Sequence, residues 1–66
     1  MIVRIENSEL FVGLSEAEAV KRVTEYGYEA RVIHRDQWTA TLIKDYDPLR
    51  VRLSVDNNKV TKAEIG

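Results

Sequence analysis

The chain has 66 residues, of which 44% are hydrophobic, ten are basic and eleven are acidic. This composition is typical of a globular chain, and a net charge of −1 argues against a general binder of polyanions. The absence of cysteine excludes a disulfide framework and cysteine-ligated zinc. We expect one domain over residues 1–66, and a domain this small buries only about 60% of its unfolded surface. Binding at a convex surface is therefore favoured over catalysis in a deep cleft.

The N-terminal residues predict a short extended segment over residues 2–6, which ends at Asn7. Its apolar run stops at Arg4, so we expect no signal peptide, and no segment has membrane-spanning length. The compartment stays open: the protein could be cytoplasmic, or secreted as a mature form. A second apolar patch at residues 10–12 is expected to pack against the core.

Ser15 and Glu18 have the spacing of a capping box, in which each side chain satisfies a free amide at the start of a helix. The helix is predicted to run from there to about Tyr26, because apolar residues recur at helical spacing. Gly27 follows, where a left-handed residue commonly ends a helix. The predicted apolar stripe consists of Ala19, Val20, Val23 and Tyr26.

Three strands are predicted after the helix, at residues 30–34, 50–56 and 59–65. The second alternates cleanly, and Asn57-Asn58 joins it to the third as a tight turn, because asparagine tolerates positive φ. Most of residues 35–49 is interpreted as a loop, and a loop longer than about ten residues is usually functional or disordered. The predicted fold class is α+β, with one α-helix packed on a small β-sheet.

His34 is the only histidine, and the serines of the chain form no catalytic pattern with it. We interpret it as a histidine at the sheet surface and expect the protein not to be an enzyme. Asp45 and Asp47 lack a third ligand and a calcium-loop pattern, so no metal and no cofactor is predicted.

A basic and aromatic face is a further candidate, because such faces bind single-stranded nucleic acid. The neighbouring aspartates and the slightly acidic balance favour ordinary solvent-facing arginines, so we expect no nucleic-acid partner. The residues concerned are Arg31, Arg35, Trp38, Tyr46, Arg50 and Arg52.

Lys44 has little meaning alone, since most surface lysines are only solvated. Its surroundings are more informative, because Asp45 follows directly and Arg50 and Arg52 share one face of the next strand. A guanidinium can hold a carboxylate through two hydrogen bonds and also donate to backbone carbonyls. Such a network could fix the Lys44–Asp45 peptide in an extended shape.

These features together resemble the potato inhibitor I family of serine-protease inhibitors, which includes eglin-like members. The resemblance covers about 55 residues, beginning at Val12-Gly13 and ending at Gly66. It is strongest over residues 45–56, where the segment Arg50 to Asp56 matches the family's loop-supporting strand. The proline-containing segment 45–51 also resembles small related bacterial and fungal inhibitors.

The resemblance implies a mixed sheet and a long exposed inhibitory loop with a scissile bond at Lys44–Asp45. It makes Lys44 the specificity residue and Arg50 and Arg52 the supports that hold Asp45. Ile43 stands where the family pattern usually has threonine. The implied reactive-site loop consists of Thr41, Leu42, Ile43, Lys44, Asp45, Tyr46 and Asp47.

The implied function is inhibition of serine endopeptidases, with trypsin-like enzymes as the first target class and subtilisin-like enzymes as the second. We expect a monomer without a membrane partner. The alternative is a non-inhibitory protein-binding or assembly module on the same fold, which would add its edge strand at residues 2–6 to a partner's sheet.

Overall fold

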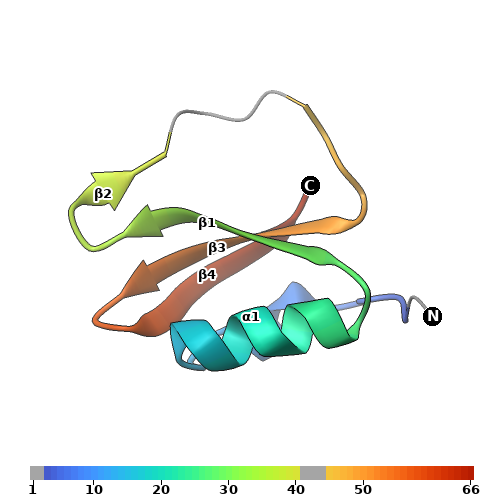
Figure 1. The fold of residues 1–66 in the computed structure, drawn as a ribbon, viewed down its shortest axis with the longest axis horizontal. Helices are drawn as coiled ribbons and strands as arrows, with labels where there is room; N and C mark the ends of the chain where they lie inside the picture. The colour runs from blue at the N-terminus through green and yellow to red at the C-terminus, as the bar shows by residue number, and fades with distance from the viewer. Residues whose placement is uncertain (1–2, 41–44) are drawn as a thin grey trace.

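The computed structural model describes residues 3–40 and 45–66 and shows one helix packed on one face of a four-stranded sheet (Figure 1). The strand order is β2-β1-β3-β4, with β1 and β3 parallel and the other neighbours antiparallel. The α+β prediction is therefore confirmed, and the sheet is mixed. The elements are the 3-10 helix η1 (Ser8–Phe11), α1 (Glu16–Glu25), β1 (Glu29–Arg35), β2 (Trp38–Thr39), β3 (Arg50–Asp56) and β4 (Lys59–Ile65).

The N-terminal segment differs from the prediction, because its described part, residues 3–6, is not a strand. Its backbone is bound instead by the segment between α1 and β1: the Val3 amide donates to the Tyr26 carbonyl (3.0 Å) and the Ile5 amide to the Tyr28 hydroxyl (3.2 Å). Ile5 is buried in the core. This described part therefore does not form the edge strand on which the assembly-module alternative relied.

The helix α1 begins and ends where the sequence predicts. The Ser15 hydroxyl accepts a hydrogen bond from the Glu18 amide (3.2 Å), and Gly27 follows with φ of 85°. Only half of the predicted capping box is seen, because the Glu18 carboxylate accepts from Arg22 Nε (3.0 Å). No helix within residues 3–40 or 45–66 is long and apolar enough to cross a membrane.

The core lies between α1 and the middle of the sheet. Val51, Leu53 and Val55 of β3 are fully buried, as are Ala19 and Val23 of α1. Burying a valine or leucine side chain contributes about 1.5–3 kcal/mol, so this contact stabilises the fold substantially. The predicted inward alternation of β3 and the apolar stripe of the helix are confirmed.

The strand β2 was missed by the sequence interpretation, which placed residues 35–49 mostly in a loop. Trp38 and Thr39 pair with β1 through a two-residue turn in which Asp36 adopts φ of 51°. The Asp36 carboxylate also accepts from the Asn57 amide (2.9 Å). This bond joins the β1–β2 turn to the predicted Asn57-Asn58 turn, where both asparagines have positive φ.

The pairing of β1 with β3 is parallel, so the chain must return along the sheet before β3 can start. The β1–β2 hairpin makes the first part of this return, and residues 45–49 lead into β3. Arg35, at the end of β1, is bound to the helix by two hydrogen bonds from its guanidinium to Glu16 (2.8 and 2.6 Å). These hydrogen bonds and the charge of Glu16 raise the pKa of Arg35.

Candidate functional site

Arg50, the first residue of β3, links two separate parts of the backbone. Its side chain is buried, with 8% of the residue exposed. Its Nε donates to the backbone oxygen of Gly66 (3.0 Å), and its Nη2 donates to the carbonyl of Asp45. A buried guanidinium needs such acceptors, because an unpaired buried charge is strongly destabilising. Arg50 therefore fixes the chain at residue 45 to the end of β4.

The chain between Asp45 and Arg50 forms a tight turn. The Asp47 carboxylate accepts from the Leu49 amide (2.9 Å), and the Asp47 carbonyl accepts from the Arg50 amide (3.1 Å). A side chain that binds an amide two residues later is characteristic of aspartate in turns. Asp47, predicted as a loop contact, therefore shapes the entry into β3.

Arg52 lies on the same face of β3 but has different neighbours. The sheet register pairs it with Glu64, and its Nη2 lies 3.6 Å from a Glu64 carboxylate oxygen. Its Nε is buried and has no hydrogen-bond partner within the described ranges. In this part of the chain neither arginine holds the Asp45 carboxylate as the sequence interpretation expected: Arg50 holds the carbonyl and Arg52 faces Glu64.

The Glu64 carboxylate beside Arg52 has a lowered pKa. The main cause is a hydrogen bond from Lys62 (2.9 Å), followed by the charges of Lys62 and Arg52. Because the folded-state pKa lies below the unfolded value, this group stabilises the fold above the unfolded pKa. The contribution is lost as the pH falls through the folded-state pKa.

We expect Lys62→Ala to raise the pKa of Glu64, because it removes the largest cause of the shift. Carbon-detected NMR titration of the Glu64 carboxyl group measures this change directly. Lys59→Ala is the matched control, since Lys59 pairs across the sheet with Asp56 and not with Arg52 or Glu64. An equal change in the pKa of Glu64 in both variants would show that Lys62 is not the main cause of its lowered pKa.

Gly66, the residue after β4, lies close to the Tyr46 ring. Its φ is 143°, and a β-carbon there would lie 3.3 Å from Tyr46 Cδ1 and 3.4 Å from Arg52 Nη2. Tyr46 is 73% exposed, and one edge of its ring lies against Gly66, where a side chain would crowd it. The absence of a side chain at residue 66 thus permits close contact between the end of β4 and the chain before β3.

We expect Gly66→Ala to destabilise the protein by about 1 kcal/mol, because it adds backbone strain and contact with the Tyr46 ring. Urea denaturation measures the stability, and NMR chemical shifts of the Tyr46 ring report the contact. Gly13→Ala is the control: φ there is also positive, at 92°, but nothing lies within 4 Å of the added carbon. Both variants should lose stability, and only Gly66→Ala should move the ring resonances.

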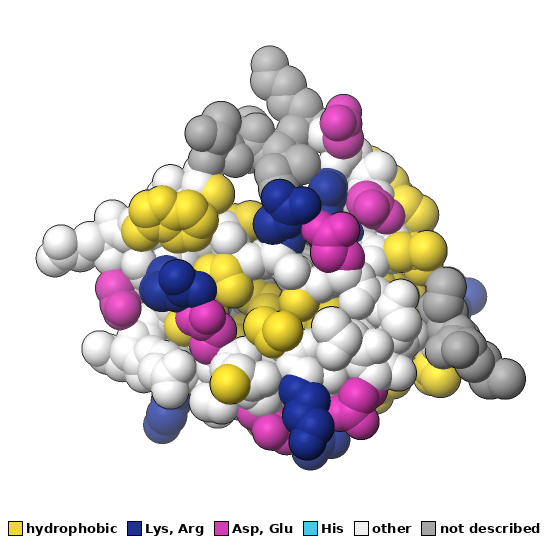
Figure 2. Space-filling view, viewed as in Figure 1, with side chains coloured by type: hydrophobic (Ala, Val, Ile, Leu, Met, Phe, Trp, Pro, Cys, Tyr) yellow, Lys and Arg dark blue, Asp and Glu magenta, His cyan; other side chains and the backbone are white. Residues whose placement is uncertain are grey.

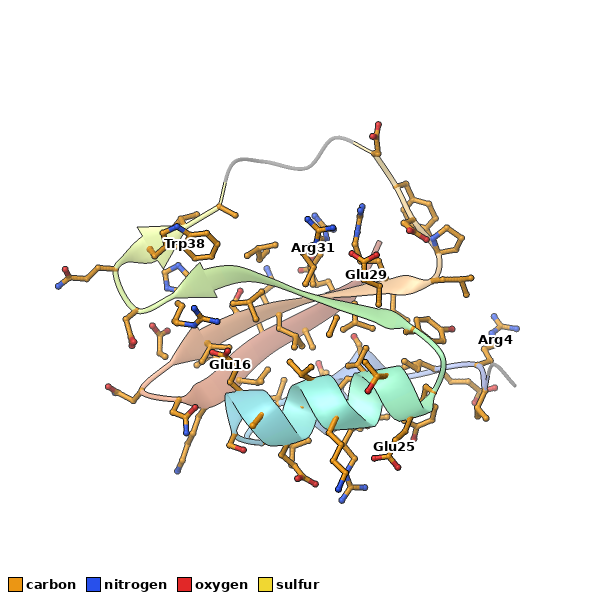
Figure 3. The ribbon with its side chains drawn as sticks, in the orientation of Figure 1. Arg4, Glu16, Glu25, Glu29, Arg31 and Trp38 are labelled. Carbon is orange, nitrogen blue, oxygen red and sulfur yellow. The ribbon has the colours of Figure 1, made fainter. Side chains whose placement is uncertain are left out.

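Arginines of the sheet lie beside acids, and Figure 2 shows dark blue and magenta side chains next to one another on one face of the molecule. Arg31 binds Glu29 (2.7 Å), and Figure 3 shows both side chains pointing away from α1. Arg50 binds backbone oxygens and Arg35 binds Glu16. The guanidinium groups of Arg31, Arg35 and Arg50 are therefore engaged within the protein.

His34 has two partners that the sequence interpretation did not identify. Its Nδ1 lies 3.1 Å from the Thr39 hydroxyl, and its Nε2 lies 3.3 Å from the Asp56 carboxylate. The missed β1–β2 hairpin brings Thr39 opposite His34. These contacts connect β2 to the end of β3. Within the described residues, 3–40 and 45–66, no group of three histidine, cysteine or acidic side chains is placed to hold a metal ion.

The predicted site residues fall into three groups. Thr41, Leu42, Ile43 and Lys44 lie outside the described residues. Asp45 and Tyr46 are exposed, whereas Asp47 is partly buried in its turn. Arg50 is buried beneath them and Arg52 is half-buried.

The fold and site define a small α+β domain, without cysteine, in which a buried arginine fixes the chain that enters β3. Comparison with known proteins finds no matching family model, no similar curated protein and no similar solved structure.

Proposed function

We propose that the protein is a reversible inhibitor of serine endopeptidases, with Lys44–Asp45 as its substrate-like bond. The observation that carries the proposal is the buried Arg50 guanidinium, which binds the Asp45 carbonyl and the Gly66 oxygen. The residue that follows the proposed scissile bond is thereby attached to the sheet. The resemblance to potato inhibitor I proteins supplies the position of the bond.

Binding would follow the mode of a substrate. The Lys44 ammonium would meet an acidic group at the base of the specificity pocket of a trypsin-like protease. A segment that is already held in its bound shape loses little conformational entropy on association, and this raises affinity. The Asp47 turn and the Arg50 hydrogen bonds supply this restraint on the Asp45 side of the bond.

The same contacts explain why cleavage would be reversible. After attack, the new amino group would belong to Asp45, whose carbonyl remains bound to Arg50. A hydrogen bond from a charged donor contributes about 1.5–3 kcal/mol, so the released end would stay near the acyl-enzyme. Religation would then compete with hydrolysis by water.

The proposal is tested by titrating trypsin, chymotrypsin and subtilisin with the purified 66-residue protein and measuring residual activity. We expect stoichiometric inhibition of trypsin and weaker inhibition of the other two enzymes. Mass spectrometry of the trypsin reaction should show slow cleavage at Lys44–Asp45 and an intact fraction that persists. Full activity of all three proteases with excess protein would exclude the proposed function.

A further inference from the structure

A groove of about 750 Å³ lies along the outer edge of β4, on a different part of the molecule from the turn at Asp47. One wall is the segment Glu6–Glu9, and the other is the half of β4 from Thr61 to Ile65. Only the first half of this edge is covered by backbone pairing: Val60 exchanges hydrogen bonds with Gly13 and Leu14 (2.8 Å each). The groove begins where that pairing ends.

The sheet register shows which backbone groups of β4 face the groove. The Gly66 amide donates to the Arg50 carbonyl (2.9 Å), so Gly66 turns its backbone toward β3. Orientation alternates along a strand, and Glu64 and Lys62 therefore also pair with β3 while Ile65 and Ala63 point away. The Ser8 hydroxyl donates to the Ala63 carbonyl (2.8 Å), as this alternation requires.

Three backbone groups at this edge are left for a partner: the amides of Ala63 and Ile65 and the carbonyl of Ile65. Within residues 3–40 and 45–66, no hydrogen bond from another element reaches them. Unpaired donors and acceptors on an edge strand that lines a groove are a template for an added strand. The floor of the groove therefore suits an extended peptide backbone.

The side chains of the groove define the chemistry of that peptide. Glu6, Glu9 and Glu64 line it, and Lys62 is the one cation among the described residues that line it. Lys62 is already bound to Glu64 (2.9 Å), and the two glutamates of the opposite wall, Glu6 and Glu9, are exposed. An added strand with lysine or arginine at alternate positions would place its cations beside these carboxylates.

We propose that this groove binds an extended, lysine- or arginine-containing segment of a partner protein, which adds a strand to the edge of β4. The proposal is independent of protease inhibition, because it uses neither Lys44 nor Arg50.

The test is NMR titration of the isotope-labelled 66-residue protein with the peptide acetyl-Thr-Lys-Val-Lys-Thr-amide. We expect saturable shifts of the Ala63 and Ile65 amides, and binding at least about fivefold weaker for the matched peptide with glutamate in place of lysine. Two N-methylated peptides test strand pairing: one carries the methyl group on valine and the other carries methyl groups on both lysines. Strand pairing uses one of these sets of amides, so one of the two peptides should fail to bind.

Variants of the protein test the acidic wall. Glu6→Gln together with Glu9→Gln should weaken binding of the lysine peptide about fivefold. Glu25→Gln, on the exposed side of the helix, is the matched control and should leave it unchanged. Absence of shifts at millimolar peptide, or equal binding of lysine and glutamate peptides, would overturn the proposal. Shifts of the same amides with protein concentration alone would show a second copy in the groove and would also overturn it.

Discussion

Lys44→Ala is expected to weaken trypsin inhibition by about three orders of magnitude or more. A side chain that fills a central pocket can account for about 4 kcal/mol of binding free energy, which corresponds to this loss. The inhibition constant measures the effect, and the midpoint of urea denaturation should stay that of the unsubstituted protein. Lys21→Ala removes an exposed lysine of the helix and should change neither quantity.

Exchange of the same residue should also redirect specificity. Lys44→Leu is expected to move inhibition from trypsin toward chymotrypsin-like and subtilisin-like enzymes, because the primary pocket reads that side chain. An inhibitor whose affinities for the panel stay unchanged in both variants would not use Lys44 as its specificity residue.

Arg50→Ala should turn the inhibitor into a substrate. The change removes the hydrogen bonds to Asp45 and Gly66 and leaves a gap in a buried site. We expect a loss of about 3 kcal/mol in the free energy of unfolding, together with much faster cleavage at Lys44–Asp45. Urea denaturation and a mass-spectrometric time course with trypsin measure the two effects. The double variant with Arg50→Ala and Arg52→Ala should be cleaved faster still at Lys44–Asp45.

Arg31→Ala is the control for this prediction. Arg31 lies beside Arg52 in the sheet register, but its side chain is exposed and binds only Glu29 among the described residues. Its removal should lower the free energy of unfolding by less than about 1 kcal/mol, as for most exposed ion pairs. If the Arg50 variant is cleaved no faster than the Arg31 variant, Arg50 does not protect the bond.

The parts of the fold that could be predicted depend on local chemistry. Ser15 and Gly27 mark the two ends of α1, and the alternation of Val51 with its neighbours identifies β3. Asn57-Asn58 marks a turn because few residues tolerate positive φ. Each of these signals is contained within a few consecutive residues, so the sequence displays it directly.

The parts that were missed depend on contacts between distant residues. Residues 3–6 have a strand-like pattern, but the Val3 and Ile5 amides donate to Tyr26 and Tyr28, which follow the helix. The hairpin to Trp38 turns at Asp36, which is a weaker turn signal than glycine or asparagine. Arg50 was predicted to hold the Asp45 carboxylate, yet it binds the Asp45 carbonyl and the backbone oxygen of Gly66, which is sixteen residues away.

The parallel pairing of β1 with β3 has a consequence for a chain that has been cut. A break between Ala40 and Asp45 would leave η1, α1, β1 and β2 on one piece and β3 and β4 on the other. Neither piece could bury its apolar face alone, since β3 supplies the buried strand on which α1 packs. The two pieces are therefore complementary halves of one core, and they should remain associated without a covalent link and reassemble when mixed.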